Sequence, residues 1–186
     1  MNRFIIAVTG ASGVIYAKRL FEYLKGKAEL HIIVSDRGVE LLNLELSKGV
    51  SFFSGENVIL HKNSRINSSI ASGSFKTQGM VIVPASMGTL GRIASGVSAS
   101  LIERVADVTL KEKRKLIVVP REAPLSSIHL KNLLTLDQAG ALVLPASPAF
   151  YNNPQSVEEL ADFVAARILD HLGVEQDLIP PYNPEK

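Results

Sequence analysis

FIIAVTGASGV, residues 4–14, is the stretch of sequence that decides the fold. Its first six residues form an unbroken apolar or β-branched run, which is typical of a strand covered on both faces of a sheet. The glycines at positions 10 and 13 interrupt this run, and residues 14–25 then carry apolar side chains at helical spacing. A buried strand that turns directly into an amphipathic helix predicts the first part of a parallel α/β sheet.

The same alternation of strand and helix recurs along the rest of the chain. Further strands are predicted at residues 30–34, 58–60, 79–83, 116–119 and 141–144. Further helices are predicted at residues 36–45, 101–113, 127–139 and 157–172. Pro84 and Pro120 are expected to end two of the strands, because proline lacks the N–H that a strand ladder needs. Five or six strands separated by helices predict a doubly wound parallel sheet in one domain.

Three of the predicted helices begin with a recognisable signal. Ser35 is an N-cap residue at the end of the second strand. Ser100 with Glu103, and Ser156 with Glu159, have the S-x-x-E spacing of a capping box. These serines therefore fix the expected helix starts.

Two stretches show no clear period. Residues 84–96 are rich in small side chains and are expected to link a strand to the helix that follows. Residues 48–76 are predicted to hold the short strand at 58–60 and a mobile or site-covering loop. Prolines at 180, 181 and 184 predict an extended tail. We expect an α/β domain at residues 1–175 and a tail at residues 176–186.

Composition excludes several classes of protein. The 186 residues include no cysteine, which excludes disulfides, thiolate metal sites and thiol-dependent catalysis. A net charge of +2 gives no argument for nucleic-acid binding. The apolar run at residues 4–8 is too short for a signal peptide or a membrane span, so a cytoplasmic protein is expected. The four histidines lack metal-ligand spacing, and no metal is assigned.

The candidate site follows from the ends of the predicted strands, because ligands of doubly wound sheets bind outside the carboxyl ends. Hydroxyl side chains gather there in TGASG at 9–13, SD at 35–36 and PASMGT at 84–89. Hydroxyls and free N–H groups at helix N-termini suit a phosphate. Glycine and serine also suit any tight turn. Three such turns together favour a phosphorylated planar cofactor.

The TGASGVI segment also resembles the start of many nucleotide-dependent dehydrogenases. Their T-G-x-x-G-x-x-G pattern needs a third glycine so that the first helix packs close to the strand. Tyr16 occupies that position here. The pair Tyr23 and Lys27 has the spacing of a Tyr-x-x-x-Lys motif but lies at the far end of the predicted helix. A dehydrogenase is therefore disfavoured.

Several charged residues carry two interpretations. Arg121 and Glu122 stand in a stiff turn between two prolines, which suits anion binding with proton transfer, whereas the alternative is an exposed ion pair. Arg167 lies four residues after Phe163 on the apolar face of a helix, so it is either a cation facing an anionic partner or a snorkelling side chain. The run KEKRK at 111–115 is typical of a solvated helix end. His129 is expected to make a structural hydrogen bond.

Longer stretches resemble the UbiX-type flavin prenyltransferases. The matching segments are TGASG at 9–13, ASGS at 71–74, PASMGTL at 84–90, LIERVADVTLKEKRKLIVVPREAPLSSIHLKNLL at 101–134 and LPASPAFYNNPQSVEELADFVAARILDHLG at 144–173. The resemblance covers nearly the whole chain, and PREAP, SSIH and FYNNPQSVEEL are its most specific motifs.

The resemblance implies a flavodoxin-like, Rossmann-like fold and a metal-independent transferase. The enzyme would join the dimethylallyl group of dimethylallyl monophosphate to N5 and C6 of reduced FMN. The prenylated FMN would pass to a UbiD-type decarboxylase. Members of the family are expected to form dodecamers with sites between subunits. The alternatives are an FMN-dependent decarboxylase that acts directly on an aromatic acid, or an FMN carrier.

The resemblance also implies roles for particular residues. FMN would be held by Gly10, Ala11, Ser12, Ser35, Ser86, Met87, Gly88, Thr89 and Arg121. Dimethylallyl phosphate would be bound by Arg104, Lys111, Tyr151 and Arg167. Catalysis would involve Glu45, Lys111, Glu122, Tyr151 and Arg167, with Glu122 or the released phosphate as the base. Cations fixed in a water-poor site would stabilise the charge that develops on the leaving phosphate.

Overall fold

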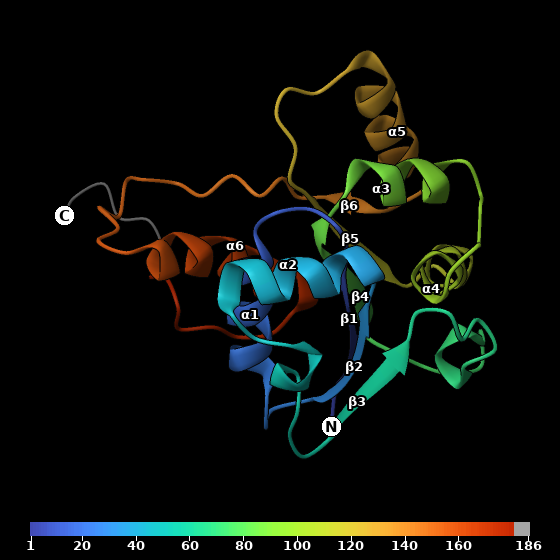
Figure 1. The fold of residues 1–186 in the computed structure, drawn as a ribbon, viewed down its shortest axis with the longest axis horizontal. Coiled ribbons are helices and arrows are strands. Elements are labelled where there is room, and N and C mark those ends of the chain that lie inside the picture. The colour runs from blue at the N-terminus through green and yellow to red at the C-terminus, as the bar shows by residue number, and fades with distance from the viewer. Residues whose placement is uncertain (181–186) are drawn as a thin grey trace.

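The strands all run parallel in one sheet (Figure 1). The computed structural model describes residues 1–180. In chain order the strands are β1 (Arg3–Val8), β2 (Glu29–Val34), β3 (Val58–Lys62), β4 (Gly79–Ala85), β5 (Lys115–Pro120) and β6 (Leu142–Val143). They lie side by side in the order β3-β2-β1-β4-β5-β6. Without the edge strand β3 this is the order of a flavodoxin-like sheet, and the winding reverses between β1 and β4.

Helices cover both faces of the sheet (Figure 1). They are α1 (Val14–Leu24), α2 (Asp36–Leu46), α3 (Met87–Ala94), α4 (Leu101–Lys111), α5 (Ser127–Gln138) and α6 (Val157–Leu172), with short 3-10 turns η1 (Val50–Phe52) and η2 (Ser69–Ala71). One buried cluster joins the sheet to α1, α2 and α6, and a second joins it to α3 and α4. The doubly wound parallel sheet predicted from the sequence is confirmed.

The central strand β1 shows why residues 4–8 are uniformly apolar. Phe4, Ile6 and Val8 are buried in the first cluster, whereas Ile5 and Ala7 are buried in the second. Successive side chains of a strand point to opposite faces, so a strand with two covered faces has no polar positions.

Helix α3 is the element that the sequence prediction missed. Residues 84–96 were expected to be an irregular link, but Met87–Ala94 is helical. Gly88 and Gly91 lower the intrinsic helix propensity of this segment. Burial of Leu90 and Ile93 against the sheet compensates for that weakness. The prediction that Pro84 ends its strand was also wrong, since β4 continues to Ala85 with a local irregularity in its pairing with β5.

The predicted helix starts are confirmed at all three serines, but the capping box predicted at the third is altered. The Ser35 hydroxyl accepts from Gly38 N, and Ser100 with Glu103 forms a complete capping box. The Ser156 hydroxyl caps α6, but the Glu159 carboxylate accepts from Gln155 N, one residue earlier than a capping box requires. Of the predicted tail, residues 181–186 lie outside the described part of the chain.

The loop after β3 is a packed segment. Ile70 and Ala71 are buried against α3 and α4. Leu101 N donates to Asn63 O at 2.8 Å, and Ile102 N donates to Asn63 Oδ1 at 3.1 Å. The loop is therefore fastened to the first turn of α4, which the weak periodicity of residues 48–76 did not indicate.

Helix α5 stands away from the sheet, beside α3 (Figure 1). Leu136 is its one buried residue, whereas Ile128, Leu130 and Leu134 are exposed. Its first turn is closed by a capping box in which Ser126 N donates to His129 Nδ1 at 3.3 Å, which confirms a structural hydrogen bond for His129. Among the described residues, no helix is long and apolar enough to cross a membrane. The cytoplasmic location stays a prediction.

A chain of hydrogen bonds at the β2–β3 edge joins four side chains. The Ser68 hydroxyl lies 3.0 Å from His61 Nδ1, His61 Nε2 lies 2.8 Å from His31 Nδ1, and His31 Nε2 lies 2.8 Å from Glu29 Oε1. Two hydrogen bonds from Arg3, at 2.7 and 3.0 Å, hold the Glu29 carboxylate. With Glu29 ionised, the chain is satisfied with both imidazoles neutral when His31 and His61 each donate through Nε2 and the Ser68 hydroxyl donates to His61 Nδ1.

We predict that this chain makes folding stability fall in mild acid. Burial, with the charges of His31 and Arg65 acting in the same sense, lowers the pKa of His61 from 6.5 to about 4. Between those two values the unfolded chain binds more protons, so the free energy of unfolding falls as the pH falls from about 6.5 towards 4. Urea unfolding at several pH values in this range measures the slope. Hydrogen bonds from Arg3 and His31 hold the pKa of Glu29 at about 2. The loss of stability that follows protonation of Glu29 therefore occurs at more acidic pH.

The matched comparison uses His61→Gln and His171→Gln. Glutamine can accept from Ser68 and donate to His31 but does not titrate, so His61→Gln should flatten the slope. His171 lies outside this chain of hydrogen bonds, at the end of α6, and its substitution should leave the slope unchanged. A wild-type stability that is independent of pH across this range would contradict the interpretation.

Candidate functional site

The buried hydroxyl of Thr9 joins the two strands at which the winding reverses. The ladder of β1 with β4 extends to Ala7 and Ile82, and one further backbone bond joins Thr9 N to Pro84 O at 3.2 Å. Beyond that point Thr9 Oγ1 donates to Pro84 O at 2.8 Å and accepts from Ser86 N at 2.8 Å. The loops after β1 and β4 are therefore held side by side, and the sequence prediction gave Thr9 no such role.

The loop after β1 ends at Gly13, where α1 begins, and Gly13 lies against the Tyr16 ring. Gly13 is the N-cap of α1 and has φ of 102°, in the left-handed region that glycine adopts without strain. A Cβ atom at Gly13 would stand 2.9 Å from the Tyr16 ring. Burial raises the pKa of Tyr16, and the nearby Arg121 charge opposes this rise. The bulky ring at the third position of the glycine pattern is consistent with the prediction that this is not a dehydrogenase loop.

Two of the serines predicted to hold FMN are helix caps at this edge of the sheet. The Ser35 hydroxyl accepts from Gly38 N at 3.1 Å and begins α2. A Cβ atom at Gly38 would stand 2.8 Å from Val8 O, so glycine allows α2 to begin against the end of β1. The Ser86 hydroxyl accepts from Thr89 N at 3.4 Å and begins α3. Both helices point their N-termini towards the β1 and β4 loops.

Arg121 completes this group from the end of β5. Its backbone N donates to Ala85 O, and its side-chain Nε donates to Ser12 O at 3.1 Å. Glu122 follows on the exposed side, where its carboxylate accepts from Ala123 N at 3.1 Å. The structure therefore brings together the predicted residues of the β1, β2, β4 and β5 loops: Gly10, Ala11, Ser12, Ser35, Ser86, Met87, Gly88, Thr89, Arg121 and Glu122.

Glu45 lies at the N-terminus of α1, although it comes from the end of α2. Its carboxylate oxygens accept from Gly13 N at 2.9 and 3.2 Å and from Val14 N at 3.0 Å. A negative charge there satisfies N–H groups that have no partner within the helix and complements the helix dipole. The site that the helix dipole makes attractive to an anion is thus filled by this chain's own carboxylate.

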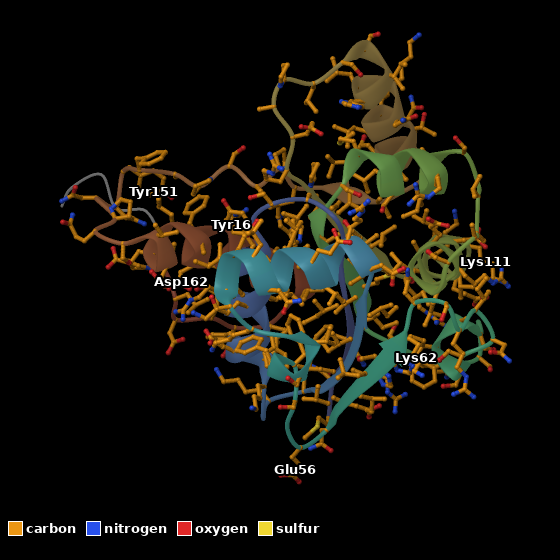
Figure 2. The ribbon with its side chains drawn as sticks, viewed as in Figure 1. Tyr16, Glu56, Lys62, Lys111, Tyr151 and Asp162 are labelled. Carbon is orange, nitrogen blue, oxygen red and sulfur yellow. The ribbon has the colours of Figure 1, made fainter. Side chains whose placement is uncertain are left out.

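The residues predicted to bind dimethylallyl phosphate do not converge within the chain. Lys111, at the end of α4, and Tyr151, before α6, lie on opposite sides of the molecule (Figure 2). Arg104 pairs with Asp107 on α4, and Arg167 pairs with Asp170 on α6, at 2.9 and 2.8 Å.

Tyr151 and Arg167 line a cavity of about 380 Å³ beside α6, together with Phe163, Ala166, Asp170, Gln176, Ile179 and Pro180. The Tyr151 ring meets the Phe163 ring edge to face, with centroids 6.1 Å apart. The Arg167 side chain is about half exposed and paired with Asp170, so within one chain it is a cation in a surface ion pair. The cavity joins an aromatic wall to a cation, which suits a small apolar group that carries an anionic end.

The loops after β1, β2, β4 and β5 offer hydroxyls, helix N-termini and one arginine to a phosphorylated ligand. Among residues 1–180, no group of three or more histidine, aspartate or glutamate side chains could hold a metal ion. The arrangement can bind an anionic, hydrogen-bonding ligand and keep a carboxylate, Glu122, beside it.

We predict that Glu45→Ala lowers the stability of the protein by about 1 kcal/mol, the usual cost of losing an N-terminal cap. Urea unfolding measures this loss. Glu22→Ala is the matched control, because Glu22 lies on α1, the helix that Glu45 caps, and pairs with Arg19 at the surface. Equal stabilities for the two variants would contradict a capping role for Glu45.

Known proteins are similar to this chain over most of its length. The Flavoprotein family model matches residues 1–169. The flavin prenyltransferase UbiX of Methanocaldococcus jannaschii is 47% identical over 176 residues, which cover 95% of this chain and 96% of that protein.

Two crystal structures are similar over nearly their full length. AnUbiX (PadA1) in complex with FMN and dimethylallyl pyrophosphate has a TM-score of 0.95 at 36% identity, with 98% of this chain and 97% of that chain covered. A dodecameric FMN-dependent UbiX-like decarboxylase from Escherichia coli O157:H7 has a TM-score of 0.93 at 37% identity, with coverages of 97% and 99%. The chain therefore belongs to the Flavoprotein family and, within it, to the UbiX-type flavin prenyltransferases.

Proposed function

We propose that this protein transfers the dimethylallyl group of dimethylallyl monophosphate to N5 and C6 of reduced FMN, and so makes prenylated FMN. The observation that carries the proposal is the gathering of Ser35, Ser86, Arg121 and Glu122 where the winding of the sheet reverses. Solved relatives with this fold, at 36–37% identity, are an FMN complex and an FMN-dependent protein. Residues 1–175 form the flavin-binding domain in this proposal.

The hydrogen bonds of these loops leave a donor that FMN can use. The Ser35 oxygen already accepts from Gly38 N, so its hydroxyl proton is available for a phosphate oxygen near the first turn of α2. Gly10–Ser12 lies next to that turn, since a Cβ atom at Gly10 would stand 2.6 Å from Arg37 Cβ. Ser86–Thr89 and Arg121 would hold the rest of the molecule. Reduced FMN supplies the nucleophilic ring atoms of the reaction.

The donor's phosphate would be held by cations. Ionisation of an allylic phosphate leaves additional negative charge on the leaving group, and positioned cations stabilise it most strongly where water is excluded. Arg104, Lys111 and Arg167 supply the cations, with Tyr151 as a hydrogen-bond donor, and we propose that no metal ion is needed. Glu122 is exposed beside the flavin loops and can take the proton that ring closure releases, as can the departing phosphate.

Lys111 and Tyr151 lie too far apart in one chain to hold the same phosphate (Figure 2). They can act together if the site lies between subunits. Oligomers are commonly symmetric, so two chains can each supply the half that the other lacks. The exposed apolar residues Ile128, Leu130 and Leu134 on α5, and Phe150 before α6, give the chain surfaces that a second copy can cover. A dodecamer, as in the relative from Escherichia coli O157:H7, is the proposed assembly.

The activity is tested by anaerobic incubation of the purified protein with reduced FMN, dimethylallyl monophosphate and a metal chelator. Mass spectrometry of the extracted flavin should show the addition of one C5H8 unit. A parallel incubation with dimethylallyl diphosphate tests whether the longer donor is used. Unmodified FMN with an intact donor would contradict the proposal.

Glu122→Gln separates an enzyme from an FMN carrier. The variant should retain FMN and lose most of the prenylated product, because the amide cannot accept a proton. Glu56→Gln, at an exposed position in the loop before β3, is the control and should keep full activity. A Glu122→Gln variant with wild-type product yield would remove this residue from the mechanism.

Direct decarboxylation is the second candidate, because the relative from Escherichia coli O157:H7 is described as a decarboxylase. It requires carbon dioxide release from an aromatic acid by the purified protein alone. In our proposal carbon dioxide appears only after prenylated FMN has been passed to a UbiD-type decarboxylase. Measuring carbon dioxide with and without that partner decides between the two functions.

The shared site is tested by combining two inactive chains. Lys111→Ala and Arg167→Ala should each abolish activity, but co-expressed they should form mixed oligomers with about a quarter of their sites intact, if each site draws on two chains. Co-expression of Tyr151→Phe with Arg167→Ala should stay inactive, because both changes affect the same half. No recovery in the first pair would show that one chain supplies the whole site.

A further inference from the structure

Glu103 is a carboxylate buried beside the proposed flavin site. It lies in the first turn of α4 and is 2% exposed. Its oxygens accept from Arg92 Nε at 2.5 Å, from Ala99 N at 2.8 Å and from Ser100 N at 3.0 Å. A buried charge is stable only when it is paired and hydrogen-bonded, so Arg92 is the cation that makes this burial possible.

Arg92 connects this carboxylate to Thr89, one of the residues predicted to hold FMN. Both lie on α3, three residues apart, so their side chains are neighbours on the helix surface. Arg92 Nη2 donates to Thr89 Oγ1 at 3.4 Å. The guanidinium also lies over Gly88, where a Cβ atom would stand 3.6 Å from Nη1. Glu103 fixes one edge of the guanidinium, and the opposite edge therefore faces the N-terminal turn of α3.

The hydrogen bonds around Thr89 define what its hydroxyl can do. The oxygen accepts from Ser86 Oγ at 3.0 Å and from Arg92 at 3.4 Å. A hydroxyl has two acceptor lone pairs and one proton, so both lone pairs are occupied and only the proton remains. No acceptor for that proton is found among the described residues. Thr89 is 6% exposed, and a buried donor without a partner is costly.

We propose that Arg92, held by Glu103, is a positioning residue that makes the Thr89 hydroxyl a hydrogen-bond donor to an acceptor oxygen of bound FMN. This inference rests on the proposed FMN binding and extends it to two residues outside the predicted site. Arg92 acts through Thr89 and does not itself touch the ligand. It also links α3, which carries the flavin loop, to α4, which carries Arg104 and Lys111 for the donor phosphate.

The test is a double-mutant cycle on the dissociation constant of FMN. Arg92→Met should weaken FMN binding by about five-fold, the effect of misdirecting one hydrogen bond. Thr89→Val should weaken it at least as much. Adding Arg92→Met to Thr89→Val should cause no further loss, because the hydroxyl that Arg92 orients is gone. Thr89→Ser keeps the hydroxyl and should keep the sensitivity to Arg92→Met.

Glu103→Gln guards against a variant that merely folds badly. Glutamine keeps the shape of the side chain and can still accept from Ala99 N and Ser100 N, but it releases Arg92. It should weaken FMN binding as Arg92→Met does, and only when Thr89 is present. Arg3→Met is the matched control, since Arg3 holds Glu29 at 2.7 Å far from the flavin loops and should affect stability alone.

Two results would overturn the inference while FMN still binds to the wild type. One is unchanged affinity in Arg92→Met. The other is an equal loss in Arg92→Met with and without the Thr89 hydroxyl, which would make Arg92 a structural residue only. Failure of the wild-type protein to bind FMN at all would instead reject the proposed function, and the inference with it.

Discussion

The hydroxyl of Thr9 is the contact on which the rest of the site depends. At the point where the winding reverses, Pro84 has no N–H to continue the strand ladder, and Thr9 bridges the gap by bonding both Pro84 O and Ser86 N. Ser86 then begins α3, and Ala85 O accepts from Arg121 N, so the β5 loop takes its position from the same segment. An apolar side chain of the same shape would offer neither side-chain bond. The Thr9 hydroxyl and the neighbouring backbone bonds, from Thr9 N to Pro84 O and from Arg121 N to Ala85 O, thus align three loops together.

Two carboxylates fix the positions of helices relative to one another. Glu45 reaches from the end of α2 to the first N–H groups of α1, and Glu103 binds the chain before α4 and the arginine of α3. In both cases a negative charge is matched by backbone donors that have no partner within their own helix. These contacts fix where a helix begins relative to a different helix, which apolar packing alone determines less strictly. The same contacts therefore position the loops that face the ligand.

Sequence periodicity was sufficient for the central strands, because residues 4–8, 79–83 and 116–119 are buried on both faces of the sheet. It failed at α3, where two glycines hide a helix that tertiary burial stabilises, and at the loop after β3, whose anchoring by Asn63 has no local signal. The strand-end rule correctly grouped Ser35, Ser86 and Arg121. It could not find the bridging role of Thr9, the contacts of Arg92 or the cap that Glu45 places on α1. Each acts on residues distant in sequence or through a side-chain pair that has no motif.

The separation of Lys111 from Tyr151 has a genetic consequence. A chain that lacks either residue can still fold and join an assembly, because both side chains are exposed and neither belongs to the core. If each site draws on two neighbouring chains, a copy that lacks one of these residues impairs one of the two sites to which it contributes and still completes the other. In a cell with one normal and one such allele, active sites would therefore be lost only in proportion to the defective chains, and two alleles defective in opposite halves would complement each other.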